Sequence, residues 1–265
     1  MSDAFAESQF GIILKWAALR RGIEYAAPKW EVESDIADGI LHSVRIDPNL
    51  VELAFGSAKE EVRKPKTAAA WCKEKVFDVA INAGMFREDH LTNVGYLKND
   101  GILNNAKFND YQSVLAFGPA KKGLPLSVIF DRDGMNGLGN VEDYRFIVQN
   151  LRLIKSPGKS VWQKQQKSWS EAAIASDSEG RILFLFSRTP FTMWEFNEKL
   201  LKLGLGIQQA MHVEGGPEAS LSIHAGGVDV DLSGSYETGF NENDDNERQW
   251  PLPNVIGVLP LRFEP

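Results

Sequence analysis

The chain has 265 residues, of which 43% are hydrophobic and 25% charged, and it carries a formal net charge of −7 with a pI near 5.3. A chain of this length can bury a substantial core, and its acidic balance argues against general nucleic-acid binding, which needs a basic face. No apolar run approaches the roughly 18 residues of a membrane span, and the single cysteine, Cys72, excludes an intramolecular disulfide or a multi-cysteine metal site.

Short strands dominate the predicted secondary structure, after an N-terminal helix that we place over residues 4–20. The strand segments are rich in β-branched and aromatic residues and are bounded by turn residues. They cover residues 39–45, 50–55, 76–81, 94–98, 113–117, 127–130, 172–175, 182–186, 210–214 and 255–259, with a strand-like run at 144–148. Glycine-containing hairpin turns are predicted at residues 99–101, 177–180 and 225–227.

Two further helices are predicted, over residues 67–75 and 192–203. Cys72 falls in the first, where a buried thiol is favoured over a nucleophile. The second has Thr192 as its cap, with Glu195 completing a capping box, and apolar residues at three- and four-residue spacing that form one core-facing stripe. Gly204 follows at the position that favours a left-handed backbone.

These elements predict an α+β protein, a single domain with a large mixed or antiparallel sheet and few helices. The polar stretch at residues 241–249 is interpreted as a surface loop, because its acidic residues lack the spacing and central glycine of an EF-hand. No cofactor and no catalytic metal is expected, although a structural divalent cation is left open.

The strand that ends at Glu214 carries the first candidate site. Strand alternation predicts that His212 and Glu214 share one face, where they would make an acid/base pair or only a surface ion pair. Gly215 and Gly216 then open the chain, and Ser220 follows within reach. Free amide groups at such a turn favour an anion such as phosphate.

A second strand ends at Asn82, which offers a hydrogen-bond donor and an acceptor. Gly84 permits close approach of a ligand to the backbone. Phe86 either presents its ring to a sugar or packs into the core. Two such strand ends, remote in sequence, suggest that the fold brings them to one site.

Supporting polar groups follow other strands. Gln149 and Asn150 end the run at 144–148, and Arg188 ends the run at 182–186, where its guanidinium suits bidentate phosphate binding. Each has an equally good interpretation as a polar loop residue. His90, just beyond the first strand end, either covers the site or is simply exposed.

With these residues in place, the chain resembles the phosphodiester glycosidase family, the domain of the uncovering enzyme and of many bacterial relatives. Residues 82–86 are similar to the family's Asn-Gly-Gly-Phe or Asn-Ala-Gly-Met-Phe strand end, and residues 214–220 to its Asp-Gly-Gly-x-x-Ser segment. A closing Arg…Pro-Asn segment is similar to residues 248–258. The family's usual aspartate is Glu214 here, so the carboxyl reaches one methylene further. The resemblance spans roughly residue 16 to the C-terminus, which implies an extension at 1–15 and a domain at 16–265.

The resemblance implies hydrolysis of a sugar-1-phosphodiester, in a glycan or a cell-envelope component of a bacterium. Glu214, Asn82 and His212 are then the expected catalytic residues. The expected substrate-binding residues are Gly84, Phe86, Gln149, Asn150, Arg188, Gly215, Gly216 and Ser220. Two alternatives are a glycan-binding protein without catalysis and a conventional two-carboxylate glycosidase, with Asp89 or Glu88 as second carboxylate. Family members often work outside the cytoplasm, yet the acidic first residues do not match a secretory leader, so localisation is left open.

Overall fold

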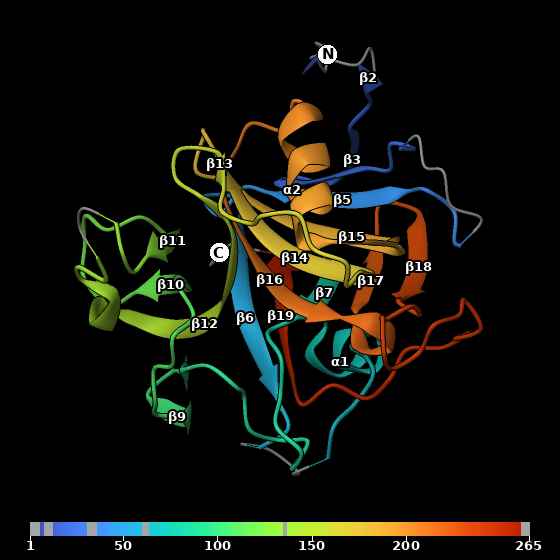
Figure 1. Ribbon diagram of the computed structural model, residues 1–265. Coiled ribbons are helices and arrows are strands. Elements are labelled where there is room, and N and C mark those ends of the chain that lie inside the picture. The colour runs from blue at the N-terminus through green and yellow to red at the C-terminus, as the bar shows by residue number, and fades with distance from the viewer. Residues whose placement is uncertain (1–5, 8–12, 31–35, 60–63, 135–136, 261–265) are drawn as a thin grey trace.

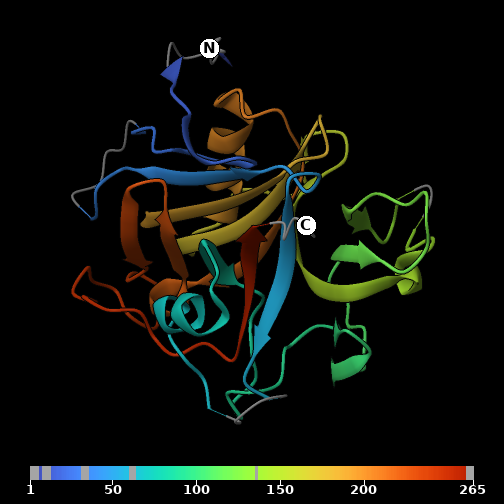
Figure 2. The same ribbon diagram turned by 180° about the vertical axis from the view of Figure 1, so that it is seen from behind.

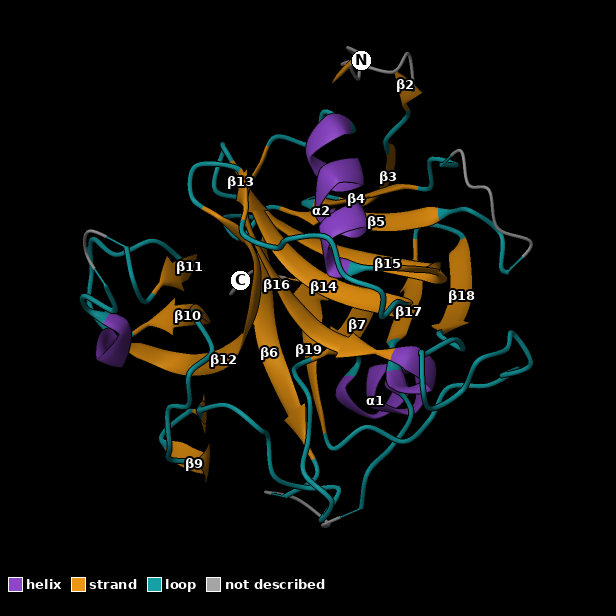
Figure 3. Cartoon of the chain, in the orientation of Figure 1, coloured by secondary structure: helices purple, strands orange, loops and turns teal. Residues whose placement is uncertain are grey.

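The computed structural model describes residues 6–7, 13–30, 36–59, 64–134 and 137–260, in which strands predominate (Figures 1 and 3). The strands of the first half are β1 (Ala6–Glu7), β2 (Ile13–Leu14), β3 (Ala17–Arg20), β4 (Ile23–Ala26), β5 (Leu41–Ile46), β6 (Val51–Ser57), β7 (Val79–Asn82), β8 (Leu97–Asn99), β9 (Ile102–Asn105), β10 (Ser113–Pro119) and β11 (Ser127–Asp131). Those of the second half are β12 (Tyr144–Lys155), β13 (Lys159–Ser160), β14 (Trp169–Asp177), β15 (Ile182–Phe191), β16 (Ile207–Gly215), β17 (Ser220–Ala225), β18 (Val228–Ser233) and β19 (Asn254–Pro260). The helices are α1 (Ala68–Lys75) and α2 (Met193–Lys202), with 3-10 turns η1 (Val141–Asp143) and η2 (Gly216–Glu218).

Two sheets form the body of the molecule (Figure 2). The larger follows the order β11-β10-β12-β16-β14-β15-β5-β4-β3, with β8, β9 and β13 attached through β12, and the smaller follows β18-β17-β7-β19-β6. Every strand pair in the described residues is antiparallel. The fold therefore confirms one domain with few helices and a mostly antiparallel arrangement. The expectation of a single large sheet is corrected to two.

The main core lies between the two sheets. In β14, Ala172 and Ile174 face it, whereas Ala173 and Ala175 face a second core beneath α2. Because both faces of β14 are covered, its sequence is apolar at consecutive positions instead of alternating. The strand thereby becomes a rigid, buried support for the residues at its end.

The helices bear out their sequence signals. Thr192 and Glu195 form the capping box of α2, with the Glu195 amide donating to the Thr192 hydroxyl at 3.2 Å. In α1, the Thr67 hydroxyl accepts from Ala70 at 3.1 Å. Cys72 is buried, and burial raises the pKa of its thiol to about 12, which agrees with a packing role. Neither helix has the length and apolar character needed to cross a membrane in the described part of the chain.

The predicted N-terminal helix is wrong within the residues that the structure describes. Residues 17–20 form β3, which turns through Gly22 (φ +84°) and pairs with β4, while residues 4–5 and 8–12 lie outside the description. Pairing to β4 and the contact of Leu19 with the main core outweigh the local helical preference. The predicted hairpins at 99–101, 177–180 and 225–227 are confirmed by the β8–β9, β14–β15 and β17–β18 pairs.

Gly257 is required where α1 meets the smaller sheet. A Cβ there would overlap the ring of Phe77. Gly257→Ala is therefore expected to lower the free energy of unfolding by about 1–3 kcal/mol, as overpacking generally does, measured by urea denaturation. In a Phe77→Ala background the same substitution should have little effect, because the ring is gone. Equal effects in both backgrounds would contradict this contact.

Candidate functional site

The two strand ends expected to meet are in direct contact. Asn82 ends β7, and its Nδ2 donates to the carbonyl of Glu218 at 3.0 Å. Its Oδ1 accepts from the amide of Ser220 at 2.7 Å. Asn82 is only 1% exposed, so its side chain fastens the turn after β16 to the end of β7. Its predicted contact with substrate stays a prediction.

Asparagine side chains also surround Gly84. Asn150, on β12, donates to the carbonyl of Ala83 at 2.9 Å. A Cβ at Gly84 would overlap Oδ1 of Asn150 and lie 2.8 Å from Oδ1 of Asn93. The glycine thus allows close approach as expected, but the groups that approach it here belong to the protein.

Gln149 has all four of its hydrogen-bonding positions in use. Its Oε1 accepts from the amides of Tyr96 and Asn109 at 3.1 and 3.0 Å. Its Nε2 donates to the carbonyls of Asn109 and Tyr111 at 3.0 and 2.7 Å. Gln149 thereby holds the segment that carries Tyr111, and burial, together with the charge of Glu214, raises the pKa of the Tyr111 phenol. Tyr111 therefore lies within electrostatic reach of Glu214.

A β-bulge at Val213 changes the predicted relation of His212 to Glu214. His212 is opposite Ala173 on β14, but Glu214 is opposite Ala172, so Val213 is an extra residue in β16. Because side chains alternate along β14, Glu214 is on the Ala172 face, toward the smaller sheet, and His212 is on the other. The expectation that His212 and Glu214 share a face is therefore wrong. Periodicity alone carries no sign of the bulge.

His212 pairs instead with a carboxyl group that sequence reasoning missed. Its Nδ1 is hydrogen-bonded to Oε1 of Glu171 at 2.6 Å, and the indole of Trp169 donates to Oε2 of Glu171 at 2.7 Å. Both members of the pair are buried, at 4% and 2% exposure. Burial raises the pKa of Glu171, against the opposing attraction of His212. This series of hydrogen bonds, from Trp169 through Glu171 to His212, fixes the orientation of the imidazole.

Four glutamates gather around this strand end: Glu171, Glu214, Glu218 and Glu237. Burial is the main cause that raises the pKa of each carboxyl. The pKa of Glu214 rises well above its usual value, with further repulsion from Glu218, Glu237 and Glu171. Groups with such perturbed pKa values are typical of catalytic sites. Glu171 and Glu237 could not be singled out in the sequence, because only strand pairing and loop packing bring them to Glu214, whereas Glu218 lies in the same 214–220 segment.

The glycine turn after Glu214 differs from the anion site that was expected. The Gly215 amide donates to the Glu214 carboxyl at 3.2 Å. A Cβ at Gly215 would meet the Trp169 indole at 2.7 Å, and one at Gly216 (φ +61°) would overlap the carboxyl of Glu237. The two glycines therefore let Trp169 and Glu237 reach the backbone. Protonation of a neighbouring carboxyl group would lower the charge repulsion between this turn and an anion.

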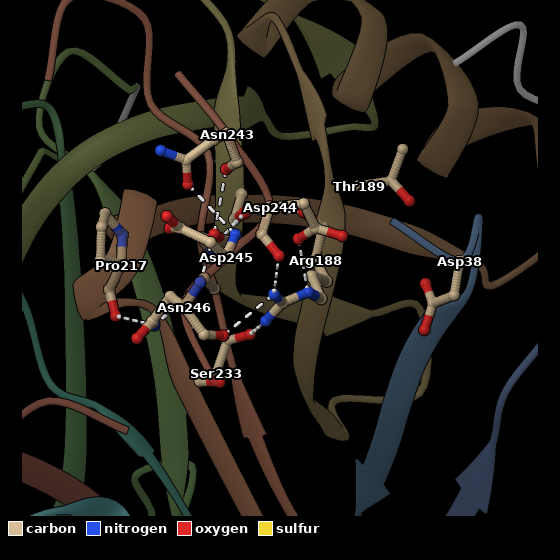
Figure 4. A network of polar contacts seen from close by, with 12 residues as sticks. Asp38, Arg188, Thr189, Pro217, Ser233, Asn243, Asp244, Asp245 and Asn246 are labelled. Carbon is tan, nitrogen blue, oxygen red and sulfur yellow. Dashed lines mark hydrogen bonds and ion pairs between the residues drawn. The ribbon is translucent and has the colours of Figure 1, made fainter. Parts of the chain in front are cut away.

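Arg188 holds a loop (Figure 4). Its Nε pairs with Asp244 at 2.7 Å, and its Nη1 donates to the carbonyl of Ser233 at 2.7 Å. Its Nη2 donates to the carbonyls of Asp244 and Asn246 at 3.1 and 3.0 Å. The guanidinium predicted to bind phosphate is committed to the protein in this arrangement, and a phosphate contact stays a prediction.

The remaining candidates lie at the edge of the site or away from it. Ser220 is buried, with its hydroxyl donating to the carbonyl of Glu218 at 3.2 Å. Phe86 is half-buried and packs near α1, and its ring lies 5.5 Å from that of His90 between centroids, tilted by 47°. Asp89 is exposed, and its hydrogen bonds from Thr92 and Leu91 lower its pKa to about 2, so it serves a turn.

Among the described residues no group of three or more His, Cys, Asp or Glu side chains is arranged to hold a metal ion.

Comparison with known proteins agrees with this architecture. The phosphodiester glycosidase family model matches residues 76–259. The catalytic domain of zebrafish N-acetylglucosamine-1-phosphodiester alpha-N-acetylglucosaminidase, auto-inhibited by its pro-peptide, has a TM-score of 0.63 and 14% identity, over 94% of this chain and 88% of that one. A hypothetical protein from Synechocystis has a TM-score of 0.61 and 15% identity, over 94% of this chain and 64% of that one. At these identities the solved structures show the shared fold alone. No curated protein matches the sequence.

Removing the Asn82 side chain should weaken the connection between the two strand ends. Asn82→Ala leaves the buried Ser220 amide without its side-chain partner and removes one of the two hydrogen bonds to the Glu218 carbonyl, so the free energy of unfolding should fall by about 1–3 kcal/mol. Asn49→Ala, at an exposed asparagine, is the matched control and should change it by less than about 0.5 kcal/mol. Equal effects in urea denaturation would contradict the role of Asn82.

The raised pKa of Glu214 makes stability depend on pH. A carboxyl whose pKa is higher in the folded state than its ordinary value of 4.5 destabilises the fold once it is ionised, so stability falls as pH rises from 4.5 through the folded pKa. Glu214→Gln should therefore raise the melting temperature at pH 8 by a few degrees and change it little at pH 4.5. Glu179→Gln, at an exposed hairpin position, should show no such pH dependence. A Glu214→Gln effect that is the same at both pH values would exclude this account.

Proposed function

This chain belongs to the phosphodiester glycosidase family, and on that premise we propose that it hydrolyses the bond between the anomeric carbon of a sugar and a phosphodiester oxygen. The substrate we propose is a phosphodiester-linked sugar of a glycan or a cell-envelope component. Free sugar and a phosphate monoester would be the products.

The observation that carries the proposal is the environment of Glu214. Its carboxyl is at the end of a buried strand, beside a glycine turn, and its pKa is raised well above the usual value by burial and by three neighbouring carboxyl groups. A carboxyl that stays protonated near neutral pH can donate a proton to a leaving oxygen, as the general acid of a glycosidase does. Glu214 is therefore our candidate for the acid.

The same raised pKa values support an anionic substrate. Protonation of Glu214 would reduce the repulsion between this turn and a phosphodiester, because a protonated carboxyl group is neutral and donates a hydrogen bond. Tyr111 is within electrostatic reach of Glu214, and its hydroxyl would add another neutral donor. The amides of Gly215 and Gly216 remain candidates for the phosphate contact. The Gly215 amide would then give up its hydrogen bond to the Glu214 carboxyl. Activity should accordingly decline toward alkaline pH.

A conventional two-carboxylate glycosidase is the second candidate. Asp89 serves a local turn, but Glu218 and Glu237 both raise the pKa of Glu214 by charge repulsion and so lie close to it. This grouping supports a second carboxyl in the reaction whichever bond is cleaved. Hydrolysis of simple aryl glycosides without any turnover of glycosyl phosphodiesters would favour this candidate.

Glu214→Gln tests the proposal directly. The variant keeps the shape of the side chain but has no proton to donate, so release of free sugar from a glycosyl phosphodiester should fall by about 10²–10⁴-fold. Glu179→Gln is the matched control and should retain full activity. Full activity of Glu214→Gln would remove this residue from the mechanism. Binding of glycosyl phosphodiesters without turnover by the wild type would instead identify a binding protein.

A further inference from the structure

A long loop, residues 234–246, brings one more carboxyl group to the strand end. The amide of Ser170 on β14 donates to the carbonyl of Tyr236 at 2.9 Å, and the amide of Ser235 donates to the Ser170 hydroxyl at 2.9 Å. Glu237 forms a β-bridge with Trp169. The 234–246 loop is therefore docked on the first residues of β14, beside Glu171.

Arg188 fixes this loop from the other side, because its guanidinium binds the carbonyls of Ser233, Asp244 and Asn246 and the carboxyl of Asp244 (Figure 4). Asn246 in turn donates from Nδ2 to the carbonyl of Gly234 at 2.6 Å. Since both ends of the loop are tied to Arg188 or its partners, the position of Glu237 between them is set by this network.

The carboxyl of Glu237 lies over Gly216, where only a glycine leaves room for it. Glu214 precedes the same turn, so the two carboxyl groups flank the Gly215–Gly216 backbone. The charged groups near Glu237 are His212 and Lys167, which lower its pKa against burial, and the carboxyls of Glu214 and Glu218, whose own pKa values it raises. Burial raises the pKa of Glu237 and the interactions with His212 and Lys167 oppose that rise, whereas the side-chain charges acting on Glu214 are all acidic.

We propose that Glu237 is a second catalytic residue, the general base that activates water, and that Arg188 is the positioning residue that holds it in place. This rests on the proposed hydrolysis. The water oxygen bonds to the anomeric carbon while the bond from that carbon to the phosphodiester oxygen breaks, and the electron pair leaves with that oxygen. Glu214 gives its proton to the leaving oxygen, Glu237 takes a proton from the water, and both groups return to their starting states by exchange with solvent.

Loss and chemical rescue test the role of Glu237. Glu237→Ala should lower kcat by about 10²–10⁴-fold, and azide, a nucleophile that has no proton to lose, should restore turnover and give a glycosyl azide. Glu237→Gln should also lose the decline of kcat toward acidic pH. Glu247→Ala, at an exposed glutamate directly after the loop, is the matched control and should behave as wild type. Full activity of Glu237→Ala, or a loss that azide does not restore, overturns the assignment.

Arg188→Lys tests the positioning role. Lysine cannot make the forked set of contacts, so kcat should fall by roughly 10²-fold, the effect of a small misplacement, while KM stays the same. Hydrogen exchange of the backbone amides in residues 234–246 should be faster in Arg188→Lys than in the wild type, and this measurement does not require enzymatic activity. Arg181→Lys, in an ion pair with Asp177 at the β14–β15 hairpin, should change neither quantity. A raised KM with unchanged kcat and unchanged exchange would make Arg188 a phosphate ligand and overturn its positioning role.

The wild-type control separates this inference from the proposed function. If the wild type hydrolyses neither glycosyl phosphodiesters nor aryl glycosides, the proposed function fails and the catalytic role of Glu237 fails with it. If the wild type is active and the Glu237 variants match it, only the present inference is overturned.

Discussion

The side chain of Asn82 connects the parts of the molecule that make the site. It binds the backbone of Glu218 and Ser220, where the chain passes from β16 in the larger sheet to β17 in the smaller one. That pair of hydrogen bonds extends the pairing of β17 with β7 to the turn after Glu214. The backbone that follows Glu214 is thereby held beside the end of β7, next to the Gly84 backbone.

One buried carboxyl group, that of Glu171, and three half-buried ones, those of Glu214, Glu218 and Glu237, gather at the site. Each of them is easier to bury protonated than ionised. The grouping of Glu214, Glu218 and Glu237 therefore lowers the free energy of unfolding at alkaline pH. Such local destabilisation is characteristic of catalytic sites. The bulge at Val213 adds a second specialisation, since it places His212 with Glu171 on one face of the sheet and Glu214 on the other.

Local signals predicted much of this protein, because turn chemistry and helix caps act over a few residues. The capping box at Thr192 and the hairpin at Asp100 are examples, and the polar residues and glycines of the two strand ends are also local features of the sequence. Partners set by long-range pairing were not predictable. The extra residue Val213 has no signature in an apolar strand, and Glu237 reaches the site only through a loop docked on β14. The helix expected at the N-terminus failed for the same reason, since β3 exists through its pairing with β4.

Substrate recognition at the end of β16 is the central claim, and a crystal structure of Glu214→Gln soaked with a glycosyl phosphodiester tests it most directly. We expect density for the sugar phosphate on the side of β16 that faces the smaller sheet, with the bridging oxygen within hydrogen-bonding distance of the residue at 214. Density confined to the groove between Asp131, Lys155 and Gln209, or to any other surface remote from β16, would contradict it.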